Sequence, residues 1–133
     1  MSNLLSILEE TPKFQIESGK TIIREEKPVN RLYILIDGEV MITKKRTPVS
    51  HIKEKGAVFG EVSALLNGKA TASVTTATTC VFHIIEDTDE FFSQNNEALL
   101  EIAKILAKRL DFVTHALVEE IDDNNSSYWT HWT

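Results

Sequence analysis

The sequence predicts a mainly β fold, an antiparallel β-roll (a double-stranded β-helix or jelly roll), with a short N-terminal helix and a C-terminal amphipathic helix. Three observations support this prediction. About eight short segments rich in β-branched and aromatic residues occupy residues 11–86. Turn-forming residue pairs, each containing glycine or proline, separate these segments. Beyond residue 86, apolar residues recur every three or four positions, which is the period of a helix.

The first element is a short helix expected over residues 2–10, with Ser2 or Asn3 as its N-cap. Thr11-Pro12 ends it, because the residue before a proline avoids the helical conformation. Its apolar side chains recur at helical spacing and are Leu4, Leu5, Ile7 and Leu8.

The expected strands follow in one continuous β region. Asp37-Gly38 is the strongest single hairpin signal, because both residues tolerate positive φ. The strand segments are PKFQI, TIIR, LYILI, EVMIT, VSHI, AVF, ASVTT and TCVFHII. The other expected turns are Ser18-Gly19, Lys27-Pro28, Thr47-Pro48, Lys55-Gly56 and Asn67-Gly68.

Two helices are expected after the β region. Thr88 is interpreted as the N-cap of a short helix, DEFFSQN, and a longer helix is expected from about Glu97 to Asp122. The apolar stripe of the longer helix can pack on the β domain or form a dimer seam. Both can also hold, with the first half of the helix on the β domain and the second half on a partner. We therefore expect a homodimer through this helix. The stripe consists of Leu99, Ile102, Leu106, Leu110, Val113, Leu117 and Ile121.

The length of 133 residues predicts one domain spanning residues 1–133. The chain has 42% hydrophobic and 26% charged residues, an ordinary globular balance. We expect the roll at 11–86, the C-terminal helices at 88–122 and a tail at 123–133. The net charge of −6 opposes binding to phosphate backbones, so no nucleic-acid partner is expected. The basic cluster at 44–46 is interpreted as the solvated tip of a hairpin.

Other features favour a cytoplasmic protein without a metal. No apolar run approaches 18 residues, so no membrane partner is expected. The N-terminus lacks the basic start and apolar region of a signal peptide. Cys80, the only cysteine, is interpreted as a core residue, and the four histidines lack metal-binding spacing.

Residues 59–74, FGEVSALLNGKATASV, predict a small anion site. Gly60 permits a tight turn, and the helical turn that follows presents unpaired N–H groups. A carboxylate at Glu61 repels a phosphate and suits sugar hydroxyls instead, while Ser63 and Thr71 add hydroxyl groups. The alternative is a scaffold in which the glycines serve turns and Glu61 stabilises the start of its own helix.

The stretches Gly19-Lys20-TIIR, LYILIDGEV, GAVFGEVSALL and TASV, followed by two helices, resemble the cyclic nucleotide-binding domain. That module occurs in catabolite-activator regulators, kinase regulatory subunits and nucleotide-gated channels. The resemblance covers roughly residues 11–122 and identifies the segment starting at FGE as the family's phosphate-binding cassette.

The resemblance implies roles for individual residues. Gly60 lets the backbone approach the ribose, Glu61 accepts from the 2′-hydroxyl, and Ser63 lies where an N–H meets the cyclic phosphate. Thr71 contacts the phosphate or the base. The ligand-binding set is Gly60, Glu61, Val62, Ser63, Lys69, Ala70, Thr71 and Ala72.

One residue departs from the family pattern: the phosphate-binding arginine falls at Ala70. Losing one partner of a buried charge pair costs about 2–5 kcal/mol, or roughly 30-fold to several thousand-fold in affinity. Lys69, one residue earlier, normally points to the opposite face of a strand and supplies a point charge rather than a fork.

These residues predict a regulatory module that acts on another protein, rather than an enzyme. No resident cofactor is expected, and cAMP or cGMP is expected to bind with weakened affinity. One alternative is a ligand-free dimeric interaction module whose pocket is a relic. In that module the partner is bound by the aromatic residues Tyr128, Trp129 and Trp132. If a nucleotide binds instead, these residues can stack on its base, and Phe112 and Thr114 are alternative base contacts. A second alternative, a cupin-like enzyme, lacks its histidine and carboxylate ligands.

Overall fold

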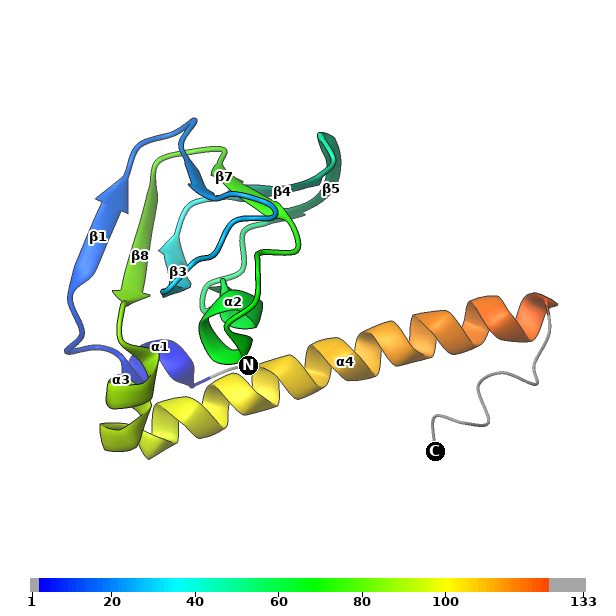
Figure 1. Ribbon diagram of the computed structural model, residues 1–133. Helices are drawn as coiled ribbons and strands as arrows, with labels where there is room; N and C mark the ends of the chain where they lie inside the picture. Colours follow the sequence, from blue (N-terminus) through cyan, green and yellow to red (C-terminus); the bar gives the residue numbers. More distant parts are fainter. Residues whose placement is uncertain (1–2, 125–133) are drawn as a thin grey trace.

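The computed structural model describes residues 3–124, and side chains up to residue 119. Its β-roll consists of two four-stranded antiparallel sheets, ordered β1-β8-β3-β6 and β2-β7-β4-β5, which confirms the predicted fold class (Figure 1). The strands are β1 (Lys13–Ile16), β2 (Thr21–Ile23), β3 (Leu32–Asp37), β4 (Val40–Lys44), β5 (Thr47–Ile52), β6 (Val58–Phe59), β7 (Ser73–Thr76) and β8 (Cys80–Ile85).

The turn at Asp37-Gly38 is not a hairpin, which corrects the sequence prediction. β3 belongs to one sheet and β4 to the other, so the chain changes sheets here. Gly38 has φ +106, and a Cβ on it would lie 2.7 Å from both Cys80 Sγ and the Thr79 carbonyl oxygen. The glycine is therefore required for a close approach at the corner of the roll.

The hairpin of this region instead joins β4 to β5. Its tip is formed by Lys45 and Arg46, with φ values of 51 and 67. Thr47-Pro48, expected as a turn, opens β5, whose place at the sheet edge tolerates a proline without an N–H.

The helices are α1 (Leu4–Ile7), α2 (Glu61–Leu66), α3 (Thr88–Gln94) and α4 (Asn96–Asn124). The N-cap of α3 is Asp87 rather than Thr88, because its side chain accepts from the Glu90 N–H at 3.1 Å. Thr88 is instead the buried first residue of the helix. Within residues 3–124, no helix has the length and apolar character needed to cross a bilayer.

Two apolar cores fix the site in place. The first lies between the sheets and contains Phe82 and Tyr33, whose rings meet edge to face at 5.7 Å. The second joins α1, α3 and the first part of α4 to the roll and includes Ala98 and Ile102. Because this second core anchors the first part of α4, that part of the helix has a defined position beside the roll.

Only part of the predicted stripe on α4 faces the roll. Ile102 is buried, whereas Leu99, Leu110 and Val113 are 42%, 63% and 58% exposed. The helix extends well past the β-roll, and its later turns project away from the strands (Figure 1). The dimer expected from those turns stays a prediction.

Candidate functional site

A cavity of about 390 Å³ lies between one sheet and α2. Its volume falls within the range of about 300–1,000 Å³ that is usual for small-molecule sites. Seven of the eight predicted ligand-binding residues line it: Gly60, Glu61, Val62, Ser63, Ala70, Thr71 and Ala72. The apolar walls are Ile23, Ile42, Val49, Ile52, Val58, Phe59, Val62 and Val74.

Lys69, the eighth predicted ligand-binding residue, and Leu66 of α2 both lie outside the cavity. Lys69 is exposed and does not line the cavity; its backbone forms an isolated bridge with Pro28. Leu66 is 75% exposed at the end of α2 and does not line the cavity either. The structure therefore does not bring Lys69 to the position that the predicted ligand set gave it.

Gly60 sets the shape of the cavity where β6 passes into α2. It is the N-cap residue of α2 and has φ 87. A Cβ at this position would lie 2.7 Å from the carbonyl oxygen of Arg31. Only glycine meets both demands, so the backbone turn that opens α2 depends on it.

Glu61 forms an ion pair with a residue of α4. Its Oε1 accepts from Arg109 Nη1 at 3.1 Å, and Arg109 Nη2 donates to the carbonyl oxygen of Val58 at 2.6 Å. The two side chains are 21% and 40% exposed, so water screens the pair only in part. α4 is therefore tied directly to the cassette.

Sequence reasoning missed Arg109 as a cavity residue. It lies 48 residues from Glu61, on the polar side of the predicted helix, where charged residues are ordinarily solvated. The one sequence feature that could have pointed to Arg109 is a charged residue beside an apolar stripe, and many other residues of the helix share it.

Ser63 and Ala70 hold the cavity walls in place through hydrogen bonds to the segment 27–29. The buried Ser63 Oγ accepts from the Val29 N–H at 2.6 Å, which fixes the segment before β3. Ala70 is 6% exposed, and its N–H donates to the Lys27 carbonyl oxygen at 2.9 Å. The small side chain at position 70 leaves the space beside it to the cavity.

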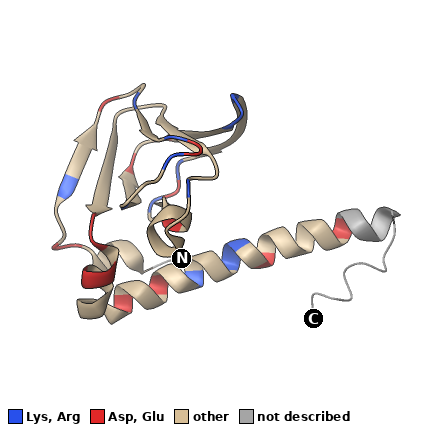
Figure 2. Cartoon of the chain, viewed as in Figure 1, with Lys and Arg blue, Asp and Glu red and all other residues tan. Residues whose placement is uncertain are grey.

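Lys44 also lines the cavity, which sequence analysis did not anticipate. The sequence predicts a solvated hairpin tip at 44–46, and Figure 2 shows basic residues on the β4–β5 hairpin, but Lys44 lines the cavity. Lys44 Nζ donates to the Thr71 carbonyl oxygen at 2.8 Å. Lys44 and Arg109 are thus the cationic side chains among the lining residues.

Two further questions from the sequence concern a metal site and the predicted contacts of aromatic residues with a base. Between residues 3 and 124, no group of His, Cys, Asp and Glu side chains is arranged to hold a metal ion. The predictions on Tyr128, Trp129 and Trp132 lie outside the residues that the structure describes. Phe112 is 75% exposed and does not line the cavity, and neither does Thr114.

Comparison with known proteins agrees with this geometry. The family model of the cyclic nucleotide-binding domain matches residues 13–93. A CRP-like cAMP-activated global transcriptional regulator of Mycobacterium tuberculosis is 31% identical over 110 residues, covering 77% of this chain and 49% of the relative. A cAMP-dependent protein kinase regulatory subunit of Dictyostelium discoideum is 28% identical over 86 residues, covering 58% of this chain and 26% of the relative.

A likeness in solved structure supports the fold. The catabolite activator protein of Thermus thermophilus superposes with a TM-score of 0.71 at 20% identity, over 84% of this chain and 55% of that protein. The chain spans at most about half the length of these two curated relatives, 49% and 26%. What they do as whole proteins is therefore not carried over with the domain.

Proposed function

This chain belongs to the cyclic nucleotide-binding domain family, and from that premise we propose that its cavity binds a cyclic nucleoside monophosphate, cAMP or cGMP, and signals its occupancy through α4. One observation carries the proposal. Glu61, which lines an open cavity beside α2, also forms an ion pair with Arg109 of α4.

Recognition divides among three parts of the cavity. The first N–H groups of α2 have no partner within the helix and favour an anion. Glu61 is an acceptor suited to the hydroxyl groups of a ribose. The apolar walls formed by residues such as Ile42 and Val74 suit the faces of a base.

In this proposal signalling depends on Glu61, because the same carboxylate contacts both the ligand and Arg109. A ribose hydroxyl that donates to this carboxylate changes the partners available to Arg109 Nη1. Arg109 stands on the same helix as the buried Ile102, so a change at the ion pair is transmitted to the packing of α4. The ligand can shift the equilibrium between two positions of α4 only by the difference between its binding free energies for the two states.

The proposal is tested by calorimetric titration of the protein with cAMP, cGMP and cyclic dinucleotides up to millimolar concentration. Saturable heat with a cyclic mononucleotide supports it. The absence of both heat and a thermal shift at millimolar ligand contradicts it and leaves the relic pocket as the interpretation.

Glu61→Gln is expected to weaken binding of the nucleotide by about 10-fold or more, because a hydrogen bond to a charged group contributes about 1.5–3 kcal/mol. The measurement is the Kd by calorimetry. Glu54→Gln, an exposed acidic residue that does not line the cavity, is the control and is expected to bind as the wild type does. Equal affinities for the two variants would show that Glu61 makes no bond to the ligand.

A second candidate function is an interaction module that assembles through α4. The observation that favours it is the exposure of large apolar side chains on the second half of α4, where Leu110 and Val113 are 63% and 58% exposed. The partner that we propose is a second copy of this chain, because paired stripes of this kind bury each other.

Leu110→Glu with Val113→Glu is expected to shift a dimer to the monomer, because two charges would be desolvated at the seam. Sedimentation equilibrium measures the change. Lys108→Glu, on the other side of the helix, is the control and keeps the dimer. A wild-type protein that is monomeric at high concentration would rule out this assembly.

A further inference from the structure

We infer that the ammonium group of Lys44 is the phosphate-binding cation of the cavity, in place of a guanidinium at position 70. The inference rests on the proposed function, since it names the residue that recognises the charged part of the ligand. The ligand class is a nucleoside with an anionic cyclic phosphate, rather than a neutral nucleoside.

The first support is the position of the charge. Lys44 Nζ lies 2.8 Å from the carbonyl oxygen of Thr71, the residue that follows Ala70. Both Thr71 and Ala70 line the cavity. The ammonium therefore stands beside the segment from which the family's arginine would reach the ligand, although it comes from another strand.

The second support is the bonding capacity that remains on Lys44. Arg109, the other lining cation, is already bonded to Glu61 and to the Val58 carbonyl oxygen. Among the described ion pairs none includes Lys44. An ammonium has three donors, and the one bond to a neutral carbonyl leaves two for phosphate oxygens.

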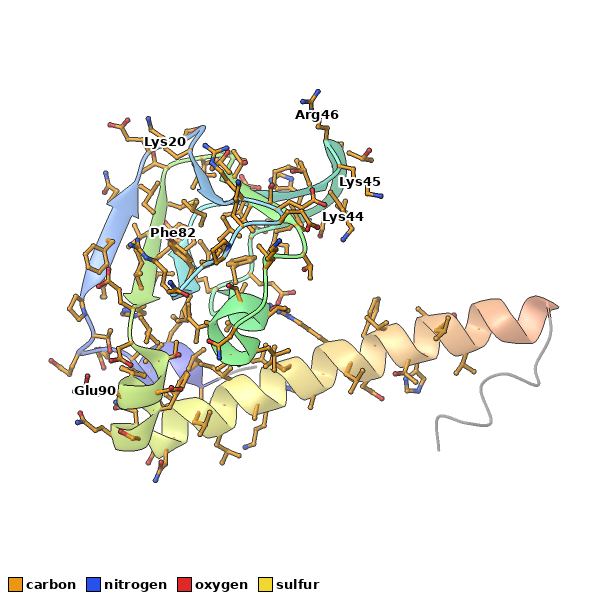
Figure 3. All side chains as sticks on the ribbon, in the orientation of Figure 1. Lys20, Lys44, Lys45, Arg46, Phe82 and Glu90 are labelled. Carbon is orange, nitrogen blue, oxygen red and sulfur yellow. The ribbon has the colours of Figure 1, made fainter. Side chains whose placement is uncertain are left out.

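The third support is the way the hairpin is held. Thr43 is paired with Ser73 of β7, so the end of β4 is fixed against the strand that follows the 70–72 segment. The Lys45 N–H donates to Glu25 Oε1 at 2.8 Å, which fixes the tip as well. Figure 3 shows Arg46 projecting from the tip, whereas Lys44 lies lower on the hairpin. Of these basic residues, only Lys44 lines the cavity.

The test compares Lys44→Gln with Lys45→Gln, its neighbour on the same hairpin, which does not line the cavity. Calorimetry measures the Kd of cAMP or cGMP and of the matching nucleoside, adenosine or guanosine, at low and high salt. Lys44→Gln is expected to weaken the nucleotide by about 10-fold or more, to leave the nucleoside unchanged, and to abolish most of the salt dependence. Lys45→Gln is expected to change none of these values.

The outcomes separate this inference from the proposed function. If the wild-type protein binds the nucleotide and Lys44→Gln binds it equally well, Lys44 is not the phosphate cation, while the proposed function stands. If Lys44→Gln weakens nucleotide and nucleoside alike, Lys44 shapes the cavity and does not pair with phosphate. If the wild type binds neither molecule, both fall. Circular dichroism of each variant verifies that the fold is retained.

Discussion

Ala70→Arg is expected to tighten the binding of cAMP or cGMP by about 10-fold or more, because a hydrogen bond to a charged group contributes about 1.5–3 kcal/mol and the guanidinium adds such bonds to those of Lys44. Position 70 lines the cavity and already carries the smallest chiral side chain, so a longer one extends into the hollow. The planar guanidinium adds a bidentate contact that the Lys44 ammonium does not make. Calorimetry of wild type and variant under one salt condition measures the gain.

Lys69→Arg is the matched control for this substitution. It places the same guanidinium one residue earlier, on an exposed side chain outside the cavity. The affinity of this control is expected to equal that of the wild type. An Ala70→Arg protein that is folded but binds no more tightly than the control would show that phosphate does not lie beside position 70.

Gly60→Ala is expected to have the second large effect, on stability and on the cavity together. A residue with a Cβ in the left-handed conformation costs about 1–2 kcal/mol. Forcing extra atoms into a packed position adds about 1–3 kcal/mol, and here the added Cβ would lie 2.7 Å from the Arg31 carbonyl oxygen. Urea unfolding followed by circular dichroism measures the loss in the free energy of unfolding.

Gly19→Ala separates the two causes. Gly19 has φ +84, close to the value at Gly60, but a Cβ there would meet nothing within 4 Å. It is therefore expected to lose only the conformational part, and its unfolding free energy falls less than that of Gly60→Ala. Equal losses in the two variants would mean that α2 moves to accept the extra atom and that the Arg31 carbonyl imposes no constraint on Gly60.

The proposed dimer and the proposed sensing role both depend on α4, but they use different sides of it. Arg109 faces the cassette, whereas Leu110 and Val113 are exposed in the single chain. A nucleotide that alters the bond between Arg109 and Glu61 thereby acts on the helix that presents the proposed dimer seam. The experiments on Glu61 and on Leu110 with Val113 examine the two ends of this connection separately.

Local chemistry made much of the fold predictable from the sequence. The β-branched segments predicted the strands, and the residues after Gly60 predicted α2, because these preferences act between near neighbours. The eight residues named as the ligand-binding set fall in two short runs, 60–63 and 69–72, and seven of them line one cavity. Their role in binding a ligand stays a prediction. The family membership of the chain follows from sequence motifs that lie within the matched range 13–93.

The sequence by itself thus determined the roll, the helices and the position of the cassette, through propensities and motifs that span a few residues. Only the tertiary structure decided that Asp37-Gly38 changes sheets, that Arg109 binds Glu61 and that Lys44 reaches Thr71. The contacts made by Arg109 and Lys44 span 48 and 27 residues. A charged side chain has no local preference for a partner that far along the chain, so the packing of strands and helices decides which charges meet at the cavity.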